Sequence, residues 1–320
     1  MNFSARALWP VLGAFYLIGG PIGLARVLHN PARPDDGGSE ATLHGDLAYL
    51  GPKGSYSDEA AGKYASRAHL DTSALTTISE IAQSVGESRV QFGLLPFENS
   101  IGGFVGETHK LLLAPQAPEW RVIADVTIPI SNNLLVKPGT RASDLRKIVS
   151  HPEALKECAN WLKSNFPELA QESMSSTAAA AEAVANGDGT IAAIASSSAA
   201  RAYQLEVLFP NIQDDQHNAT NFVVIQATAR DFPEQNPTRL IVWLDGKQGA
   251  EAPGQLVEDL KHLSFTLTSA DTGPTGTFGS HRFALIFDSA HGADLGQVQN
   301  VLRPIGALLI GAYRPSDAMP

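Results

Sequence analysis

The segment Asp214-Asp-Gln-His-Asn-Ala-Thr220-Asn-Phe-Val-Val-Ile225 changes abruptly from polar to apolar. Its polar part ends in a hydroxyl, Thr220, and its apolar part, residues 222–225, is rich in β-branched side chains. An apolar run without alternation is typical of a strand that is buried on both faces. A side chain at the end of such a strand is held rigidly and still reaches a cleft. The segment therefore predicts a buried strand with Thr220 at its edge; the alternative is a threonine that only caps a loop.

Length and composition limit the class of protein. The chain has 320 residues, of which 43% are hydrophobic, so two or three folded units are expected. A formal charge of −10 argues against a nucleic-acid partner, which needs a basic face. Cys158 is the only cysteine, so the chain has neither an intrachain disulfide nor a thiolate metal cluster.

The N-terminal part, residues 1–45, is predicted to be a leader and a linker. Residues 7–25 carry no charge and are flanked by Arg6 and Arg26, and the run is close to the ~20 residues that span a bilayer. A signal anchor, an export signal, an acid-poor transit peptide and a disordered leader are all compatible with it. Residues 30–45, rich in Pro, Asp and Gly, predict a linker, and folded structure is expected from Asp46.

A strand at 47–50 is predicted to run into the turn Gly51-Pro52-Lys53-Gly54-Ser55-Tyr56-Ser57. The glycine and lysine spacing does not match a phosphate-binding P-loop. The turn instead predicts the start of a helix with Ser57 as its N-cap. Free backbone N–H groups at a helix start suit an anion, so Ser55 and Ser57 are candidate substrate contacts.

A second helix is predicted from the capping-box spacing at 77–80, and a strand at 90–95 follows it. Glu98-Asn99-Ser100 comes directly after this strand, and glycines that allow close backbone approach follow it. Consecutive polar residues at the end of a buried strand are costly unless they face a cleft. We therefore expect either a site or an ordinary loop here.

The middle of the chain repeats the strand and helix alternation. Strands are predicted at 122–130, 133–136 and 191–195, with helices that begin near Ser150, Ser176 and Ser196. The helix starting at Ser150–Glu153 places Cys158 in the core, and His151 at its start is expected to be neutral because the helix dipole disfavours imidazolium. Ser176 and Thr177 predict a carboxylate cradle or a plain N-cap. Such alternation favours parallel α/β lobes.

The C-terminal part predicts the βαββαβ order of a ferredoxin-like unit. The expected elements are strands at 239–244, 263–270, 281–288 and 305–313, and helices at 253–262 and 295–303.

These motifs together resemble the prephenate dehydratase family. Its signature matches at Glu98, Asn99, Ser100, Gly103, Val105 and Thr108. Further family motifs match in order at residues 51–57, 150–155, 176–180 and 218–222. The resemblance covers about residues 47–227, and five ordered motifs make it specific.

The resemblance implies an α/β fold in which a two-lobed catalytic domain of the type II periplasmic-binding-protein kind is followed by an ACT-like regulatory domain. The catalytic domain is expected at 46–228, with one lobe at about 46–121 and 205–228 and the other at about 122–204. The ACT-like domain is expected at 237–316. Clefts of this kind commonly close by a hinge.

The resemblance also implies a reaction that makes the prephenate ring aromatic by loss of carbon dioxide and water, with neither a metal nor a redox cofactor. Thr220 is the residue expected to assist the leaving hydroxyl, while Asn99 and Ser100 bind polar groups and Glu98 orders the loop or takes part in catalysis. Ser176 and Thr177 are expected to bind a carboxylate, and Asn221 and Phe222 to contact the substrate.

Two departures from the family pattern affect anion binding. The family usually reads Thr-Arg-Phe where this chain has Thr220-Asn221-Phe222, and relatives often carry His at the position of Asn132. Asparagine cannot neutralise a carboxylate. Arogenate dehydration, a non-aromatising prephenate decarboxylase and a non-catalytic module that binds an aromatic acid are therefore kept as alternatives. Thr220 and the C-terminal unit count against the decarboxylase.

The C-terminal residues Pro253, Gly254 and Leu256 match the usual helix start of an ACT domain, whose expected effector is phenylalanine. The family's Glu-Ser-Arg-Pro effector motif is Asp271-Thr272-Gly273-Pro274 here, so the arginine that would bind a carboxylate is lost. This argues against feedback inhibition and leaves a role in assembly. The resemblance implies a homodimer or homotetramer with a small-molecule substrate and a cytoplasmic location, while the N-terminal segment leaves export, anchoring or organelle targeting open.

Overall fold

The computed structural model describes residues 46–114, 117–246 and 251–316. The predicted leader at 1–45 lies outside these residues. Within the described ranges, no helix is both long and apolar enough to cross a membrane.

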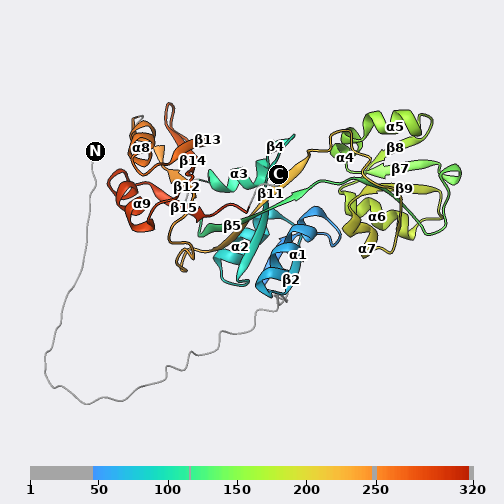
Figure 1. Ribbon diagram of the computed structural model, residues 1–320, viewed down its shortest axis with the longest axis horizontal. Coiled ribbons are helices and arrows are strands. Elements are labelled where there is room, and N and C mark those ends of the chain that lie inside the picture. Colours follow the sequence, from blue (N-terminus) through green and yellow to red (C-terminus); the bar gives the residue numbers. More distant parts are fainter. Residues whose placement is uncertain (1–45, 115–116, 247–250, 317–320) are drawn as a thin grey trace, which may run out of the picture. The chain divides into compact units, whose positions relative to one another are not determined.

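The described strands form two sheets, which Figure 1 shows with their helices. The first sheet has the order β13-β14-β12-β15-β5-β11-β3-β1-β2, and the short β4 pairs with β3. In its N-terminal half the strands are β1 (Leu47–Leu50), β2 (Thr72–Leu75), β3 (Phe92–Asn99), β4 (Gly103–Phe104), β5 (Trp120–Pro129) and β11 (Ala219–Ala227).

Helices cover both faces of this half of the sheet. Alanines of α1 (Tyr56–Ala68) pack on one face, and the apolar side of α2 (Ile78–Gly86) packs on the other together with α3 (Gly106–Leu112). The β11 residues alternate between these cores, because Phe222 and Val224 join the first and Val223 and Ile225 the second. The prediction of a buried strand after Thr220 is thus confirmed.

The second sheet has the order β10-β6-β9-β7-β8. Its strands are β6 (Asn133–Val136), β7 (Lys147–Ser150), β8 (Ala170–Ser173), β9 (Ile191–Ala195) and β10 (Glu206–Phe209). The helices α4 (Pro152–Glu157) and α5 (Ala159–Asn165) pack on one face, whereas α6 (Thr177–Asn186) and α7 (Ser197–Ala202) pack on the other (Figure 1). A short 3-10 turn, η1 (Ala142–Asp144), precedes β7. Cys158 is fully buried in the first of these cores, as predicted.

The sheets are mixed rather than purely parallel, in contrast to the prediction. The strand β11 runs antiparallel to both β3 and β5, and β6 runs antiparallel to both β9 and β10. The chain returns to the first lobe through β11, which reverses the strand direction. Both lobe boundaries also lie later in the sequence than predicted, because β5 belongs to the first sheet and β10 to the second.

The C-terminal elements follow the predicted βαββαβ order. They are β12 (Arg239–Leu244), α8 (Ala252–Lys261), β13 (Thr266–Pro274), β14 (His281–Asp288), α9 (Leu295–Leu302), the 3-10 turn η3 (Arg303–Ile305) and β15 (Leu308–Tyr313). The strand order β13-β14-β12-β15 is that of a ferredoxin-like sheet. The strand β15 also pairs in parallel with β5 through Gly311 and Val122, so both units share a continuous sheet. The sequence did not predict this junction.

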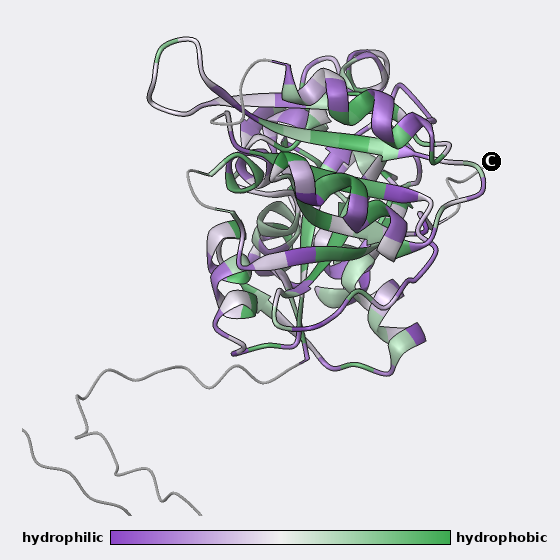
Figure 2. Cartoon of the chain, turned by 90° about the vertical axis from the view of Figure 1, so that its left-hand side faces the viewer, coloured by the Kyte–Doolittle hydropathy of each residue, from purple (hydrophilic) through white to green (hydrophobic). Residues whose placement is uncertain are grey.

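The turn before α1 is attached to the second lobe. The Ser196 hydroxyl donates to the Gly54 carbonyl at 2.9 Å, and Gly54 has a φ of +84°. A Cβ at Gly54 would lie 3.0 Å from the Ala199 Cα, so only glycine allows this approach. Figure 2 shows hydrophobic residues concentrated along the strands between the covering helices.

Candidate active site

A cavity of about 320 Å³ lies between the two lobes, within the size range of small-ligand sites, roughly 300–1,000 Å³. Residues of both lobes line it, and many of them belong to the sequence motifs. Its lining comprises Leu50, Gly51, Ser55, Tyr56, Ser57, Asn99, Ile130, Asn132, His151, Glu153, Ala154, Glu157, Ser175, Ser176, Thr177 and Thr220.

The beginnings of α1, α4 and α6 all contribute to this lining. Ser55 caps α1 and Ser176 caps α6, each by accepting a backbone N–H three residues later. The N-cap predictions at Ser57 and Ser150 were wrong: Ser57 lies inside α1, and His151 caps α4. The chain enters the helical conformation two residues earlier at α1 and one residue later at α4 than the motifs suggested. First-turn N–H groups have no partner within their helix, so these starts offer donors to an anion.

The hydroxyl of Thr220 meets the amide of Asn99 at the wall of the cavity. Both residues face each other in the antiparallel pairing of β11 with β3. The Asn99 Nδ2 donates to Thr220 Oγ1 at 3.0 Å and to Asn218 Oδ1 at 2.7 Å. The Thr220 side chain is largely buried, with the residue 9% exposed.

The neighbouring loop fixes the orientation of the Asn99 amide. The backbone N–H groups of Ile101 and Gly102 both donate to Asn99 Oδ1, at 3.0 and 2.7 Å. A backbone N–H can only donate, so the oxygen must face the loop and the NH2 group must face Thr220. Thr220 Oγ1 is consequently an acceptor toward Asn99. Its own O–H remains available to donate to a ligand in the cavity.

A chain of hydrogen bonds continues from Asn99 around the cavity. Asn218 Nδ2 donates to one oxygen of Glu157 and Asn132 Nδ2 to the other, each at 2.8 Å. The Tyr56 hydroxyl in turn donates to Asn132 Oδ1 at 2.8 Å. Burial, and then the nearby Glu157 carboxylate, raise the pKa of Tyr56 well above its usual range, so this hydroxyl stays protonated. The network holds Thr220 and Asn99 in a fixed geometry.

The charge on the cavity wall is negative. Glu153 and Glu157 line it, and none of its described lining residues is Lys or Arg. The Nδ1 of His151 accepts the Glu153 N–H at 3.3 Å, which leaves Nε2 as the ring nitrogen that can donate. An adjoining cavity of about 820 Å³ shares Asn99, Glu153 and Glu157 and adds Lys156. Helix starts, amides and hydroxyls are thus the groups in this lining that can donate to an anion.

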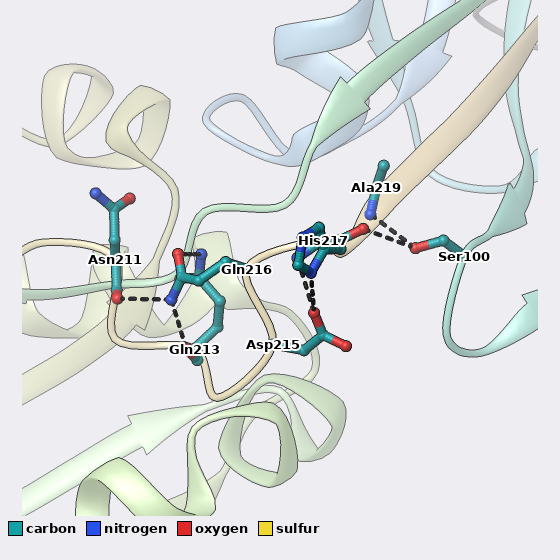
Figure 3. A network of polar contacts seen from close by, with 7 residues as sticks. All are labelled: Ser100, Asn211, Gln213, Asp215, Gln216, His217 and Ala219. Carbon is teal, nitrogen blue, oxygen red and sulfur yellow. Dashed lines mark hydrogen bonds and ion pairs between the residues drawn. The ribbon is translucent and has the colours of Figure 1, made fainter. Parts of the chain in front are cut away.

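Ser100 ties two chain segments together and does not line the cavity. Its Oγ accepts the Ala219 N–H at 2.9 Å and donates to the His217 carbonyl at 3.3 Å. Figure 3 shows these contacts beside the loop at 211–217, in which Asp215 contacts His217. The structure thus places Ser100, predicted as a site residue, outside the cavity lining, where its hydroxyl closes β11 onto β3.

Three other predicted site residues also lie away from the cavity. Asn221 points to the opposite face of β11, where its Nδ2 donates to Asp125 Oδ2 at 3.1 Å and to Thr127 Oγ1 at 2.9 Å. Phe222 is 2% exposed and belongs to the core. Glu98 is exposed and does not line the cavity. Neighbouring side chains alternate between the faces of a strand, so residues next to Thr220 and Asn99 in sequence cannot all face the ligand.

The predicted effector residues of the C-terminal unit are spread over different environments. Leu256 is fully buried in the core, whereas Gly254 is exposed. Asp271 Oδ2 lies 2.5 Å from Nδ1 of His109 on α3, so this carboxylate already has a partner within the chain. Asp271 Oδ1 also accepts the Thr272 N–H at 2.8 Å.

Three residues of the hydrogen-bond network at the cavity were not predicted as site residues, namely Tyr56, Glu157 and Asn218. Glu157 lies at the end of a helix, and Asn218 lies two residues before Thr220. Tyr56 and Asn218 lie within matched motifs and Glu157 lies two residues after one, and these positions of polar residues were the only available signal.

Two α/β lobes, with a small-ligand cavity between them that has helix starts on both sides and one oriented hydroxyl, define the class of protein. Within that class the chain belongs to the prephenate dehydratase family, whose sequence model matches residues 47–230.

Curated relatives agree with this assignment. A bifunctional chorismate mutase/prephenate dehydratase of Neisseria gonorrhoeae is 31% identical over 81% of this chain and 70% of its own length. Arogenate dehydratase/prephenate dehydratase 6 of Arabidopsis thaliana is 37% identical over 62% of this chain and 48% of its own. The crystal structure of a prephenate dehydratase from Arthrobacter aurescens, in complex with L-Phe, shares the fold. Its TM-score is 0.74 at 24% identity, over 86% of this chain and 91% of that one.

Proposed function

We propose that this chain is a prephenate dehydratase that converts prephenate to phenylpyruvate for phenylalanine synthesis. The observation that carries the proposal is the Thr220 hydroxyl at the cavity wall. Asn99 donates to its oxygen, which leaves its hydrogen free to donate inward.

The reaction requires one proton at the leaving hydroxyl. The bond from the ring to its carboxylate breaks, carbon dioxide leaves, and the electron pair completes the aromatic ring while the ring hydroxyl departs. The hydroxyl takes a proton and leaves as water. Thr220 has the ordinary acidity of an alcohol, so its contribution is positioning and hydrogen bonding, with a proton relayed from solvent.

The two carboxylates of prephenate need donors that the cavity provides without lysine or arginine. The helix start at Ser176 and Thr177 is one cradle, and the start of α1 after Ser55 is another. The Nε2–H of His151 is a further donor in the lining. These groups support binding of a dianion, with less charge neutralisation than an arginine would give.

Arogenate is a second candidate substrate, favoured by the acidic lining. It differs from prephenate by carrying an ammonium group where prephenate has a keto group. Glu153 and Glu157 can pair with that ammonium, and no described cation in the lining competes with it. Dehydration of arogenate would give phenylalanine directly.

The test is to incubate the purified full chain with prephenate and, separately, with arogenate. Phenylpyruvate or phenylalanine is expected as the aromatic product, and the ratio of kcat/KM values identifies the preferred substrate. A non-aromatic product that keeps the ring hydroxyl would establish a decarboxylase instead. Tight binding of either acid, measured by calorimetry without any turnover, would favour a non-catalytic binding module.

For the organisation of the chain we propose a catalytic domain at 46–228 and an ACT-like domain at 237–316 that supports a homodimer. The ferredoxin-like strand order of the second unit supports this assignment. Phenylalanine is the candidate effector, although Asp271 already contacts His109. Sedimentation of the full chain with and without phenylalanine tests both the assembly and the effector.

A further inference from the structure

A second cavity, of about 370 Å³, lies where the C-terminal unit joins the first lobe. Arg121 of β5 and Phe232, which follows β11, form one side of it. The other lining residues come from α9, η3 and the start of β15, and β15 pairs with β5. None of its lining residues lines the cavity that contains Thr220. The two cavities are therefore separate.

Arg121 is the central polar group of this second cavity. Its Cζ lies 4.7 Å from the centroid of the Phe232 ring, so the guanidinium stacks on a buried aromatic face. Its Nε is shielded from solvent and has no hydrogen-bond partner among the described residues. Asp231 attracts the guanidinium through space without forming an ion pair, and burial lowers the pKa of Arg121. An unpaired donor that solvent does not reach, such as this Nε–H, is costly unless a ligand satisfies it.

A second guanidinium lines the same cavity. Arg303 lies at the end of α9, is exposed, and forms no ion pair with any described residue. Asp and Glu are both absent from the described lining, so the two arginines make the cavity positive. Arginine presents a planar set of donors that matches a carboxylate in a bidentate way.

The remaining wall is mainly apolar. Leu302 is 2% exposed, while Leu308, at the cavity's outer side, is 44% exposed. A ligand that both pairs with the two arginines and packs on the apolar wall must therefore combine an anionic head with an apolar body.

We propose that this cavity is a second ligand site, which binds a small carboxylate that carries an apolar group. Arg121 and Arg303 hold the carboxylate, and the body of the ligand packs on Leu302 and its apolar neighbours. The site is distinct from the predicted effector residues Pro253, Gly254, Leu256, Asp271 and Thr272, none of which lines it.

The test is calorimetric titration of the full chain with 3-phenylpropionate as probe and inorganic phosphate as a purely polar comparison. Binding of 3-phenylpropionate is expected to weaken about 10- to 100-fold in Arg121→Met, the range for loss of hydrogen bonds to a charged group. Because Arg121 is half-buried, Arg303→Met provides a second test at an exposed position and is expected to weaken binding as well. The matched control is Arg146→Met, which removes an exposed arginine outside every described cavity lining and should bind like the parent.

The outcomes are separable from those of the Thr220 site. Turnover of prephenate or arogenate in the absence of the probe should be the same in Arg121→Met as in the parent chain. No detectable binding of 3-phenylpropionate to the parent, or equal affinity in the parent and both arginine variants, would overturn the proposal. Phosphate binding as tightly as 3-phenylpropionate would overturn the assigned ligand class. None of these results depends on whether the chain is a dehydratase.

Discussion

Replacing Thr220 by valine removes one hydroxyl from the cavity and keeps the shape of the side chain. Thr220 Oγ1 accepts a single hydrogen bond, from Asn99 Nδ2 at 3.0 Å. In the variant Asn99 Nδ2 still has two acceptors, Asn218 Oδ1 at 2.7 Å and the Ala219 carbonyl at 3.2 Å. No buried donor is left unpaired, so the free energy of unfolding should fall by only about 0.5–1.5 kcal/mol.

The effect on turnover should be much larger. A positioned proton-transfer group contributes ~10²–10⁴ to the rate. This corresponds to about 3–5 kcal/mol in the activation free energy. We therefore expect kcat of Thr220→Val to fall by that factor while KM changes little, because the hydroxyl acts mainly as the leaving group departs. The assay is the initial rate of aromatic product formation from prephenate or arogenate, whichever the parent prefers.

Two variants make this experiment specific. Thr127→Val is a matched control, because Thr127 Oγ1 also accepts one amide hydrogen bond, from Asn221 at 2.9 Å, but on the face of the sheet away from the cavity. It should lose similar stability and keep its activity. Thr220→Ser retains the hydroxyl and should keep most of the turnover. Equal rates in Thr220→Val and the parent would remove this hydroxyl from the reaction, and equal losses in Thr220→Val and Thr127→Val would reduce its role to structure.

Three further changes test the network, the buried thiol and the lobe contact. In Glu157→Gln, one of the two asparagine amides that donate to Glu157 faces an NH2 group instead of an oxygen. We therefore expect KM to rise about tenfold and the rate with arogenate to fall more than the rate with prephenate. Equal losses with both substrates would exclude a contact between Glu157 and the ammonium group. Burial raises the pKa of Cys158 to about 12 from 9.0, so the folded state holds this proton more tightly than the unfolded chain does. Its contribution to stability is therefore complete below about pH 9 and is lost as the pH rises toward 12; urea unfolding of Cys158→Ala should show a smaller alkaline decline than the parent, and identical declines would contradict the assignment. Gly54→Ala places an alanine in the left-handed region of φ and brings its Cβ within 3.0 Å of the Ala199 Cα. The midpoint of urea unfolding should therefore drop by an amount equivalent to about 1–3 kcal/mol. The control Gly62→Ala, whose new Cβ has no neighbour within 4 Å, should not be destabilised.

The strands and helices that the sequence predicted best have strong local signals. The bounds of β6, β9, β12 and β14 match their predicted ranges, because apolar runs with clear breaks define them. The caps at Ser57 and Ser150 were wrong, because several adjacent polar residues can cap and tertiary contacts select one. The pairing of β15 with β5 joins two units that are far apart in sequence, and no local pattern encodes such a contact.

The site was partly predictable for a related reason. Motif positions identified Thr220, Asn99, Ser176 and Thr177, and the structure places all four in one cavity lining. Asn221 was assigned to the ligand because it occupies the position of the arginine in the family motif, whereas strand alternation turns it toward Asp125. The network through Glu157 joins residues from different lobes, and only the folded chain brings them together.

The junction between β15 and β5 affects how the protein can be divided. If a shortened chain ended after residue 230, β5 would become an edge strand of the sheet, because β15, which now pairs with it through Gly311 and Val122, would be missing. Such unprotected margins pair with other molecules. A protein cut at this point would thus tend to self-associate or aggregate, even though its cavity residues remained, and the C-terminal unit would be needed for solubility.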